Sequence, residues 1–354
     1  DIFKTNVKEG GEGPSETRRS TPDINQGEKE SASSSADTDN ESSSKQSNLS
    51  NVEEVSKRTG KRKAAAADEE QPQAKRRKDL PTKKNLINAQ RAEFEAKYKQ
   101  QNQLGKGGYG CVFAGYRKAD NLPVAIKHIT KQKGQNGKQL PSEVAVMLKL
   151  QAGKTGLSGE SAAVSLLDWY DLDQELILVL ERPVPCMDLL RYVRGNGGAL
   201  HEEKAKIILK QLIDAAVQLE DNCIFHRDIK MENILIETSS DVPRVRLIDF
   251  GLSCSFEKQS VYRAFGGTLQ HAPPEWHFCH SYRPGSTTVW QIGVALFELL
   301  HRKGRFDTTR FLRRELTISN ELSKNCQDFL QKSLNPCDMM RPTLKELQLH
   351  PWLS

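Results

Sequence analysis

Long hydrophobic runs and paired cysteines are both missing from this sequence. A membrane-spanning helix takes about 20 apolar residues, and the apolar run Glu175–Leu180 is long enough only for a buried strand. The seven cysteines are scattered along the chain and never spaced C-x-x-C. We therefore expect no membrane contact, no disulfide framework and no zinc site, and a reducing compartment is the simplest environment for the chain.

A large charge excess and a full complement of apolar residues are missing as well. The 52 basic and 46 acidic residues leave a net charge of +6, which is too small to mark the whole chain as a nucleic-acid binder. Apolar residues make up 36% of the chain and aromatic residues 6%. An apolar share of 36% is low for a wholly globular protein. Part of the chain is therefore expected to be unfolded.

The N-terminal quarter of the chain accounts for this shortage. Residues 1–90 hold 17 Lys and Arg, 16 Asp and Glu, and a single aromatic residue, Phe3. Residues 31–50 include nine serines. Such a stretch cannot bury enough apolar surface to offset the entropy lost on ordering. We predict a disordered tail over residues 1–93, in preference to a small polar domain.

Two basic clusters, Lys61–Lys63 and Lys75–Lys78, lie in this tail with 11 residues between them. Their spacing resembles a bipartite nuclear-import signal, whose clusters occupy two acidic pockets of an import receptor. We therefore expect such a receptor as a partner, and a location in the nucleus and/or the cytoplasm. A solvated charge run and a nonspecific contact with RNA or DNA are the alternatives. No aromatic residues interleave the clusters, which argues against base stacking.

From about Phe94 the pattern becomes that of a folded domain. Strands are predicted first, and a helix at 140–151 should turn Val144, Met147 and Leu148 to one face. After Asp188 helical spacing dominates. This order of a strand-rich front and a helix-rich back indicates an α+β fold. The strand-like segments are 101–118, 122–130 and 173–181, and the helical ones are 204–222, 289–300, 328–334 and 343–350.

A glycine-rich motif comes first among the chemical signals. Gly105, Gly107 and Gly110 are spaced G-x-G-x-x-G, with Val112 two residues further on. Glycines let a tight turn bring backbone N–H groups close to phosphate oxygens. A dinucleotide-binding turn would run directly into a helix, whereas the alternating segment that follows here favours a hairpin over a nucleotide. A plain hairpin turn remains open at this point.

Lys127 ends the apolar segment Val124-Ala125-Ile126-Lys127. A lysine on an apolar strand is costly unless it has a partner, and Glu143 on the next helix is the best candidate. Their ion pair would hold Lys127 toward the α- and β-phosphates of a nucleotide. The alternative is a lysine that extends its ammonium group to solvent.

The most specific signal is the run of residues from His226 to Asn233, which reads H-R-D-x-K-x-x-N. Asp228 can accept the proton of a substrate hydroxyl, and Lys230 can neutralise charge on a moving phosphoryl group. Asn233 can hold a magnesium ion. Asp249, in the sequence Asp-Phe-Gly behind a predicted strand, supplies a carboxylate as the second ligand of that hard cation.

These segments, in this order, resemble eukaryotic protein kinases over residues 94–354. The resemblance implies a bilobal fold, with a small β-rich N-lobe at about 94–182 and a larger helical C-lobe at about 183–354. It also implies ATP and Mg²⁺ as cofactors, proteins as substrates, and a brace between Glu275 and Arg341. Lys230 resembles the serine/threonine branch of the family, in which Thr268 helps to position the substrate hydroxyl.

A closer resemblance is to the Pim kinases, carried by the hinge-like segment Glu181–Pro185 and by the chain's last residues. Pro183 has no N–H to donate to adenine, so ATP should depend more on apolar contacts, to which Ile248 can add. The residues that the resemblance assigns to ATP are Leu104, Gly105, Gly107, Gly110, Val112, Ala125, Lys127, Leu180, Glu181 and Leu235.

Some positions depart from the Pim pattern. Pim kinases have an acidic groove that selects basic residues before the target serine or threonine. Asp188 and Glu232 keep two acidic positions, but Arg191 and Lys303 stand where further acids are expected. Thr288 stands where most kinases have an aspartate that braces the catalytic loop. The preference for arginine-rich substrates should therefore be weaker or redirected.

Two other functions compete with this interpretation. A kinase-shaped scaffold without turnover would lack one of the four key residues, yet Lys127, Asp228, Asn233 and Asp249 are all present. A nucleic-acid binder that uses the basic tail would lose affinity steeply with salt. We expect an active, monomeric enzyme.

Overall fold

The computed structural model describes residues 82–108, 110–131, 140–153, 162–302 and 305–354. The two basic clusters, Lys61–Lys63 and Lys75–Lys78, lie outside the described residues, as does Lys303. Within the part that is described, no helix combines the length and the apolar character needed to cross a membrane.

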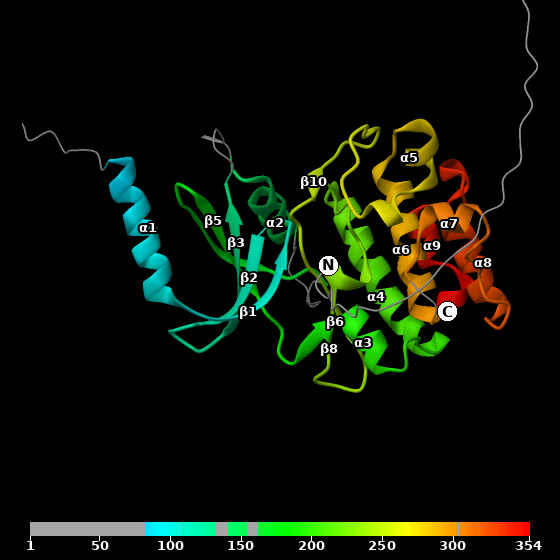
Figure 1. The fold of residues 1–354 in the computed structure, drawn as a ribbon, viewed down its shortest axis with the longest axis horizontal. Helices are drawn as coiled ribbons and strands as arrows, with labels where there is room; N and C mark the ends of the chain where they lie inside the picture. The colour runs from blue at the N-terminus through cyan, green and yellow to red at the C-terminus, as the bar shows by residue number, and fades with distance from the viewer. Residues whose placement is uncertain (1–81, 109, 132–139, 154–161, 303–304) are drawn as a thin grey trace, which may run out of the picture. The chain divides into compact units, whose positions relative to one another are not determined.

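The N-lobe is built on an antiparallel sheet of five strands in the order β1-β2-β3-β5-β4 (Figure 1). Strands β1, β2 and β3 pair in the order in which they occur along the chain, and β5 lies between β3 and β4. The strand-like segments predicted at 101–118, 122–130 and 173–181 are confirmed. The strands are β1 (Tyr98–Gly107), β2 (Gly110–Arg117), β3 (Pro123–Thr130), β4 (Leu166–Asp171) and β5 (Glu175–Glu181).

The strand register sorts the side chains of this sheet into two faces. Val112 on β2 is opposite Lys127 on β3, and Ala125 on β3 is opposite Leu180 on β5. Residues directly opposite one another share a face, and so do residues two apart on one strand. Val112, Ala125, Lys127 and Leu180 therefore occupy the same face, although they come from three different strands.

The other face of the sheet is covered by helix α1 (Lys83–Lys97). Phe94 of α1 is buried in an apolar cluster with Ile126 and Val179, which point away from the Lys127 face. The tail was expected to be disordered through residue 93, and the structure differs from this expectation from Lys83 onward. The helix forms because the sheet buries its single large aromatic residue, which is a tertiary effect rather than a local one.

Helix α2 (Ser142–Ala152) packs on the Lys127 face of the sheet. Val144 and Met147 are buried as predicted, but Leu148 is 39% exposed. The prediction that all three share the buried face is therefore wrong for Leu148. In a helix of 3.6 residues per turn, Leu148 lies 100° beyond Met147, and that rotation carries it to the edge of the packed stripe.

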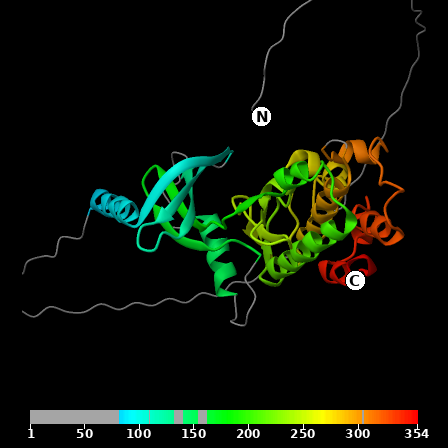
Figure 2. The same cartoon turned by 90° about the horizontal axis from the view of Figure 1, so that it is seen from below.

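The C-lobe is mainly helical, and the helices predicted from the spacing at 204–222, 289–300, 328–334 and 343–350 are confirmed with shifted ends. A single apolar cluster runs from α2 and β5 into α4 and α6, which lie side by side (Figures 1 and 2). The helices are α3 (Leu189–Gly195), α4 (Glu202–Asp221), α5 (Pro274–Cys279), α6 (Pro284–Leu300), α7 (Thr308–Leu312), α8 (Lys324–Ser333) and α9 (Leu344–Gln348).

Two small sheets flank the loop between β7 and β8. The first has the order β6-β8-β9 and the second pairs β10 with β7. Their short antiparallel ladders fix the loop between β7 and β8, which contains the run from His226 to Asn233. The strands are β6 (Cys186–Asp188), β7 (Ile224–Phe225), β8 (Ile234–Glu237), β9 (Arg244–Leu247) and β10 (Cys254–Ser255).

Candidate active site

Lys127 and Glu143 form a buried ion pair between β3 and α2. The Lys127 ammonium lies 2.8 Å from Glu143 Oε1 and 3.0 Å from Oε2, and both residues are 5% exposed. The sequence-based prediction of this pair is confirmed. A pair this deeply buried is costly unless its geometry is good, and here the ammonium donates to both carboxylate oxygens.

Asp249 joins this pair from the C-lobe. Its Oδ1 lies 2.8 Å from Lys127 Nζ. Burial alone would raise the pKa of the Asp249 carboxyl, but the Lys127 ammonium and the hydrogen bond from the Gly251 N–H together hold that pKa below its usual value. The Asp249 backbone has φ +63, a left-handed conformation that is unfavourable for a residue with a side chain. The next residue, Phe250, is buried against the ring of His226.

The carboxylate of Asp228 is the centre of a second group of hydrogen bonds. Thr268 donates to its Oδ1 through both its backbone N–H, at 3.0 Å, and its hydroxyl, at 2.7 Å. Lys230 Nζ lies 2.6 Å from Asp228 Oδ2 and also donates to the Thr268 hydroxyl at 2.8 Å. The structure thus places Asp228, Lys230 and Thr268 together, and it shows that an alcohol fits within hydrogen-bond distance of the carboxylate.

Asn233 connects the hydrogen bonds around Asp228 with the segment that carries Asp249. Its Nδ2 donates to the Asp228 backbone carbonyl at 2.8 Å and to Oδ2 at 3.1 Å. The amide oxygen of Asn233 is therefore turned away from these two acceptors. Ile248, immediately before Asp249, donates its N–H to the Asn233 carbonyl at 3.0 Å, which ties the two segments together.

The oxygen donors of this region suit a hard divalent cation. Lys127, Glu143 and Asp249 together carry a net charge of −1, so a cation beside Asp249 is electrostatically favoured. Asp249 offers a carboxylate and Asn233 an amide oxygen, which are ligands that Mg²⁺ takes. The residues present therefore fit a magnesium ion.

The glycine-rich hairpin between β1 and β2 contains one glycine that the fold itself requires. Gly110 has φ +135, and a Cβ there would lie 1.9 Å from the His128 carbonyl oxygen. At Gly105 and Gly107 an added Cβ would meet no described protein atom within 4 Å. Packing within the chain therefore explains Gly110 but not the other two, whose lack of a side chain leaves room for a ligand's phosphates to approach the backbone.

The apolar residues expected around a nucleotide are only partly brought together. Val112, Ala125 and Leu180 share one face of the sheet, as the register shows. Leu235 lies on β8 in a different sheet, and Leu104 is 44% exposed on the edge strand β1. The first three thus form a continuous apolar wall, whereas the other two lie on separate elements.

The side chain of Glu181 is held by groups of the protein itself. Arg246 Nη2 lies 2.5 Å from Glu181 Oε1, and the Ser165 N–H donates to Oε2 at 3.0 Å. Arg246 is buried and comes from β9 of the C-lobe. Its pair with Glu181 anchors the connection between the lobes, so this carboxylate has a structural partner rather than a free position beside a nucleotide.

Within the described part of the chain, the arginine before Asp228 is held by uncharged groups. Arg227 Nη2 donates to the Tyr282 hydroxyl at 2.7 Å and to the Ala264 carbonyl at 3.1 Å. The guanidinium also lies over the ring of Tyr262, 5.1 Å from its centroid. These contacts fix the segment that leads to Thr268.

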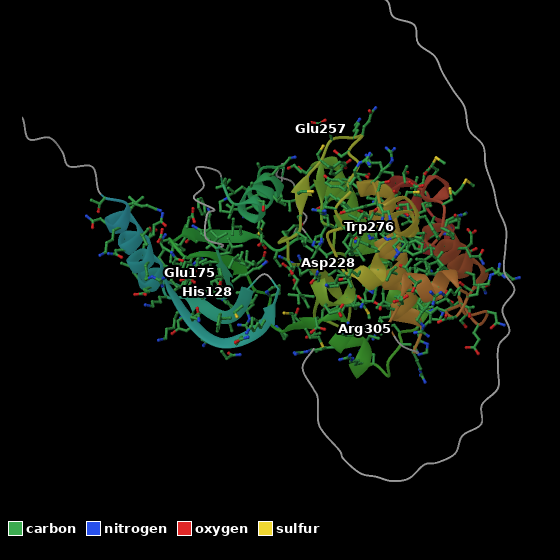
Figure 3. The ribbon with its side chains drawn as sticks, turned by 45° about the horizontal axis from the view of Figure 1, so that its top comes forward. His128, Glu175, Asp228, Glu257, Trp276 and Arg305 are labelled. Atoms are coloured by element: carbon green, nitrogen blue, oxygen red, sulfur yellow. The ribbon has the colours of Figure 1, made fainter. Side chains whose placement is uncertain are left out.

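The two acidic residues retained from the Pim pattern are each paired with an arginine of the chain. Asp188 Oδ2 lies 3.2 Å from Arg191 Nε, and Glu232 Oε1 lies 3.1 Å from Arg305 Nη2. Arg305 and Asp228 both belong to the C-lobe (Figure 3). Arg305 was not singled out in the sequence, because nothing local indicates that it reaches Glu232.

Gln291 and Arg246 are two further residues that sequence reasoning missed. Gln291 bonds to the backbone on both sides of Asp228, and Arg246 bonds to Glu181. A signal was present for Gln291, since it is an amide within the almost wholly apolar segment 289–300 and a buried amide needs partners. Arg246 gave no such signal, because it alternates with Val245 and Leu247 as a solvent-facing strand residue would.

Comparison with known proteins gives the following matches. The sequence matches the family described as protein kinase domain over residues 98–353. It is 35% identical over 271 residues to the serine/threonine-protein kinase pim-2 of Danio rerio, which covers 73% of this chain and 86% of that protein. It is 31% identical over 274 residues to the serine/threonine-protein kinase prk-2 of Caenorhabditis elegans, covering 74% of this chain and 59% of the nematode protein.

A more distant match is the PAS domain-containing serine/threonine-protein kinase of Mus musculus. It is 27% identical over 263 residues, which is 74% of this chain and only 19% of the mouse protein. The chain therefore spans most of the fish kinase, a smaller part of the nematode kinase and a minor part of the mouse one. Each of the three matches covers 73% or 74% of this chain.

Proposed function

Because the chain belongs to the protein kinase family, we propose that Asp228 accepts the proton of the substrate hydroxyl during phosphoryl transfer. The chain is an ATP-dependent serine/threonine protein kinase that resembles the Pim kinases. The observation that carries the proposed role is the 2.7 Å hydrogen bond from the Thr268 hydroxyl to Asp228 Oδ1. A substrate serine or threonine presents the same chemical group to the same carboxylate.

The proposed reaction needs one acceptor and one source of positive charge among the chain's own residues. The substrate oxygen forms a bond to the γ-phosphorus of ATP, the bond from that phosphorus to the bridging oxygen breaks, and ADP leaves. The hydroxyl proton goes to Asp228. Lys230, whose ammonium lies beside both Asp228 and Thr268, neutralises charge on the transferred group.

The family's cofactors are ATP and Mg²⁺. We propose that Asp249 and Asn233 hold the magnesium ion, whose charge offsets that of the phosphates. Lys127, fixed by Glu143, would bind the α- and β-phosphates. Gly105, Gly107 and Gly110 would place the β1–β2 hairpin over them. Transfer of phosphate from labelled ATP to a serine peptide measures the activity directly.

The proposed adenine site is the apolar wall of Val112, Ala125 and Leu180, with Leu104 and Leu235 completing it. Pro183 has no N–H, so the hinge offers one hydrogen-bond donor fewer than a residue of another type would. Because Arg246 and Ser165 hold the Glu181 carboxylate, we assign the nucleotide contact of Glu181 to its backbone rather than to its side chain.

We further propose that substrate selection by this kinase depends little on basic residues before the target site. The carboxylates of Asp188 and Glu232 are each neutralised by an arginine of the chain. Arg191 and Arg305 are themselves 75% and 68% exposed, so a substrate arginine would meet positive charge at this surface. Like charges at an interface disfavour a partner.

This proposal predicts the effect of removing the two arginines. In the variant Arg191→Gln/Arg305→Gln, we expect the kcat/KM ratio of an arginine-rich peptide to its glutamine analogue to rise about three- to tenfold, because each exposed pair is worth up to about 1 kcal/mol. Initial rates with the two matched serine peptides measure this ratio. Arg194→Gln, on the same helix α3, is the control and should leave the ratio unchanged. A parent enzyme that already prefers the arginine peptide by several orders of magnitude would contradict the proposal.

We propose that the basic clusters Lys61–Lys63 and Lys75–Lys78 bind a nuclear-import receptor, so that the protein is found in the nucleus as well as the cytoplasm. The support is their spacing in the sequence, two cationic runs separated by 11 residues. Replacing Lys75–Lys78 with alanines should shift a fluorescent fusion of the full chain to the cytoplasm. The control replaces Arg18 and Arg19 in the same tail. An unchanged nuclear signal in the Lys75–Lys78 variant would refute the proposal.

A further inference from the structure

Gln291, on helix α6, is bonded to the polypeptide on both sides of Asp228. Its Nε2 donates to the Arg227 carbonyl at 2.6 Å, and its Oε1 accepts from the Ile229 N–H at 3.3 Å. The side chain is 2% exposed. One buried amide therefore spans the residue whose carboxylate receives the substrate proton.

The two peptide groups that flank Asp228 contain two N–H and two carbonyl groups, and each of these four has a hydrogen-bond partner, as buried backbone groups require. The Asp228 N–H donates to His226 Nδ1 at 3.3 Å, and the Asp228 carbonyl accepts from Asn233 Nδ2 at 2.8 Å. The remaining two groups, the Arg227 carbonyl and the Ile229 N–H, both bond to Gln291. His226 and Asn233 belong to the loop itself, so Gln291 is the partner that ties this loop to a helix.

The loop has a backbone conformation that needs such support. Arg227 has φ +72, in the left-handed region that residues with a Cβ adopt at a cost. Gly267 crowds the same peptide group, since a Cβ there would lie 2.7 Å from the Arg227 carbonyl oxygen. A strained conformation persists only where surrounding contacts over-determine it. The short bond from Gln291 to this carbonyl is one of those contacts.

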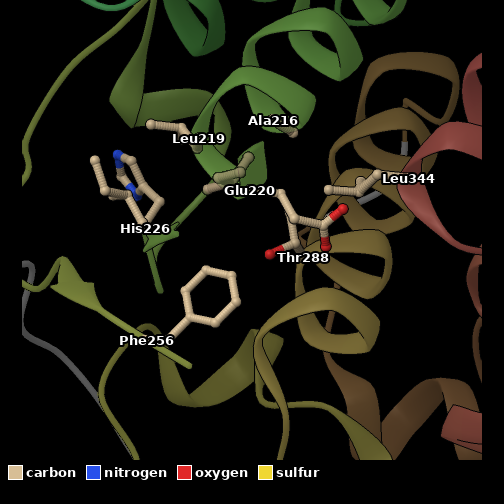
Figure 4. A pocket seen from close by; sticks show the side chains of 9 residues that line it. Ala216, Leu219, Glu220, His226, Phe256, Thr288 and Leu344 are labelled. Carbon is tan, nitrogen blue, oxygen red and sulfur yellow. The ribbon is translucent and has the colours of Figure 1, made fainter. Parts of the chain in front are cut away.

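Thr288, one turn earlier on α6, does not supply this support. Its hydroxyl donates to the Pro284 carbonyl of its own helix at 2.8 Å. Thr288 and His226 both line a small cavity (Figure 4). Helix α6 is otherwise apolar along this stretch, with Trp290 and Ile292 wholly buried beside Gln291.

We propose that Gln291 is a positioning residue that holds Asp228 in the geometry of proton acceptance. The proposal rests on the role proposed above for Asp228, because Gln291 acts through that residue and does not itself touch substrate. It predicts that losing the amide lowers kcat while the binding of ATP is kept. Misplacing a catalytic group by about 1 Å can cost about 100-fold in rate.

Gln291→Met tests this directly, because methionine keeps about the length of the glutamine side chain and removes both hydrogen bonds. We expect kcat with a serine peptide to fall about 10- to 100-fold, and KM for ATP to change less than about twofold. Thr288→Val is the matched control on the same helix, and its kcat should stay close to that of the parent. Thermal melting of each full-length variant gives the folded fraction by which rates are divided.

Gln291→Glu adds a readout that a purely structural role would not move. A protonated carboxyl group can donate to the Arg227 carbonyl and accept from the Ile229 N–H, as the amide does here, whereas a carboxylate offers only acceptors. The carboxylate would face the Arg227 carbonyl and lie close to the charge of Asp228, with Lys230, His226 and the Arg227 guanidinium as the other titratable or charged groups of this loop. We therefore expect the activity of Gln291→Glu, relative to the parent at each pH, to rise as the pH falls from 8 to 6.

Three outcomes would overturn the proposal. One is a parental kcat in Gln291→Met, and another is an equal fall in Gln291→Met and Thr288→Val. The third is a ratio of Gln291→Glu to parent activity that does not change with pH. Failure of the underlying role is distinguishable from these, because it would show as retained activity in Asp228→Asn whatever the Gln291 variants do.

Discussion

Asp228→Asn is expected to lower kcat by about 1,000-fold, because a positioned general base contributes about 100- to 10,000-fold. In the structure both carboxylate oxygens accept hydrogen bonds, Oδ1 from Thr268 and Oδ2 from Lys230 and Asn233. An asparagine must turn its NH₂ group toward one of these donors and cannot accept the substrate proton. Initial rates of phosphate transfer to a serine peptide measure the loss.

The variant should keep its affinity for ATP. None of the residues proposed to bind the nucleotide is changed, so KM for ATP should differ less than about threefold from that of the parent. Asp241→Asn, at an exposed position between β8 and β9, controls for loss of one carboxylate and should leave kcat unchanged. If Asp228→Asn kept more than about a tenth of the parental kcat, the proton acceptor would have to be another group.

Much of the fold could be predicted from the sequence because its elements carry an apolar pattern within their own length. The strands β2, β3 and β5 and the helices α4 and α6 each carry a local apolar pattern that specifies their type. Helix α1 carries no such pattern. It is held by the burial of Phe94 and by ion pairs such as Arg91 with Glu175, whose nitrogen and oxygen lie 2.7 Å apart. Contacts 84 residues apart in sequence leave no local signal.

The candidate site could be predicted where the chemistry makes a single residue conspicuous. Lys127 on an apolar strand needs an anion, and Glu143 on the following helix is the next acidic residue after it in the chain, so their pair could be predicted. The bond from Lys127 to Asp249 spans 122 residues and depends on how the two lobes meet. The sequence predicted Asp249 as a metal ligand, but its place beside the Lys127–Glu143 pair comes only from the fold.

Charge pairing at the surface was the least predictable feature. The sequence shows Arg191 three residues after Asp188, at helical spacing, so that pair could have been inferred. Arg305 lies 73 positions after Glu232, and its pairing depends on the tertiary fold. A count of acidic residues therefore overstates the negative charge that a substrate meets, because the fold neutralises both of these carboxylates with its own arginines.

Breaking the ion pair between Glu275 and Arg341 should lower the free energy of unfolding far more than breaking an exposed ion pair. The resemblance to kinases predicted this brace, and the structure confirms it: Arg341 Nη1 and Nη2 bond to Glu275 Oε1 and Oε2 at 2.9 and 2.6 Å. The Arg341 side chain is 0% exposed and lies over the Trp290 ring, 4.9 Å from its centroid. Arg341 also donates to the Ser286 carbonyl at 3.0 Å, so it joins α5 to the start of α6.

Glu275→Gln leaves the guanidinium buried without its anion, and breaking a buried pair in this way costs about 3–5 kcal/mol. We expect the free energy of unfolding in urea to fall by that amount. Lys332→Ala, which removes an exposed pair with Asp328, should change it by less than about 0.5 kcal/mol. The double variant Glu275→Gln/Arg341→Met should lose less than the sum of the single variants, because no unpaired charge remains. Additive losses would mean that the two side chains stabilise the C-lobe separately, through packing against Trp290 and the Ser286 carbonyl, rather than through each other.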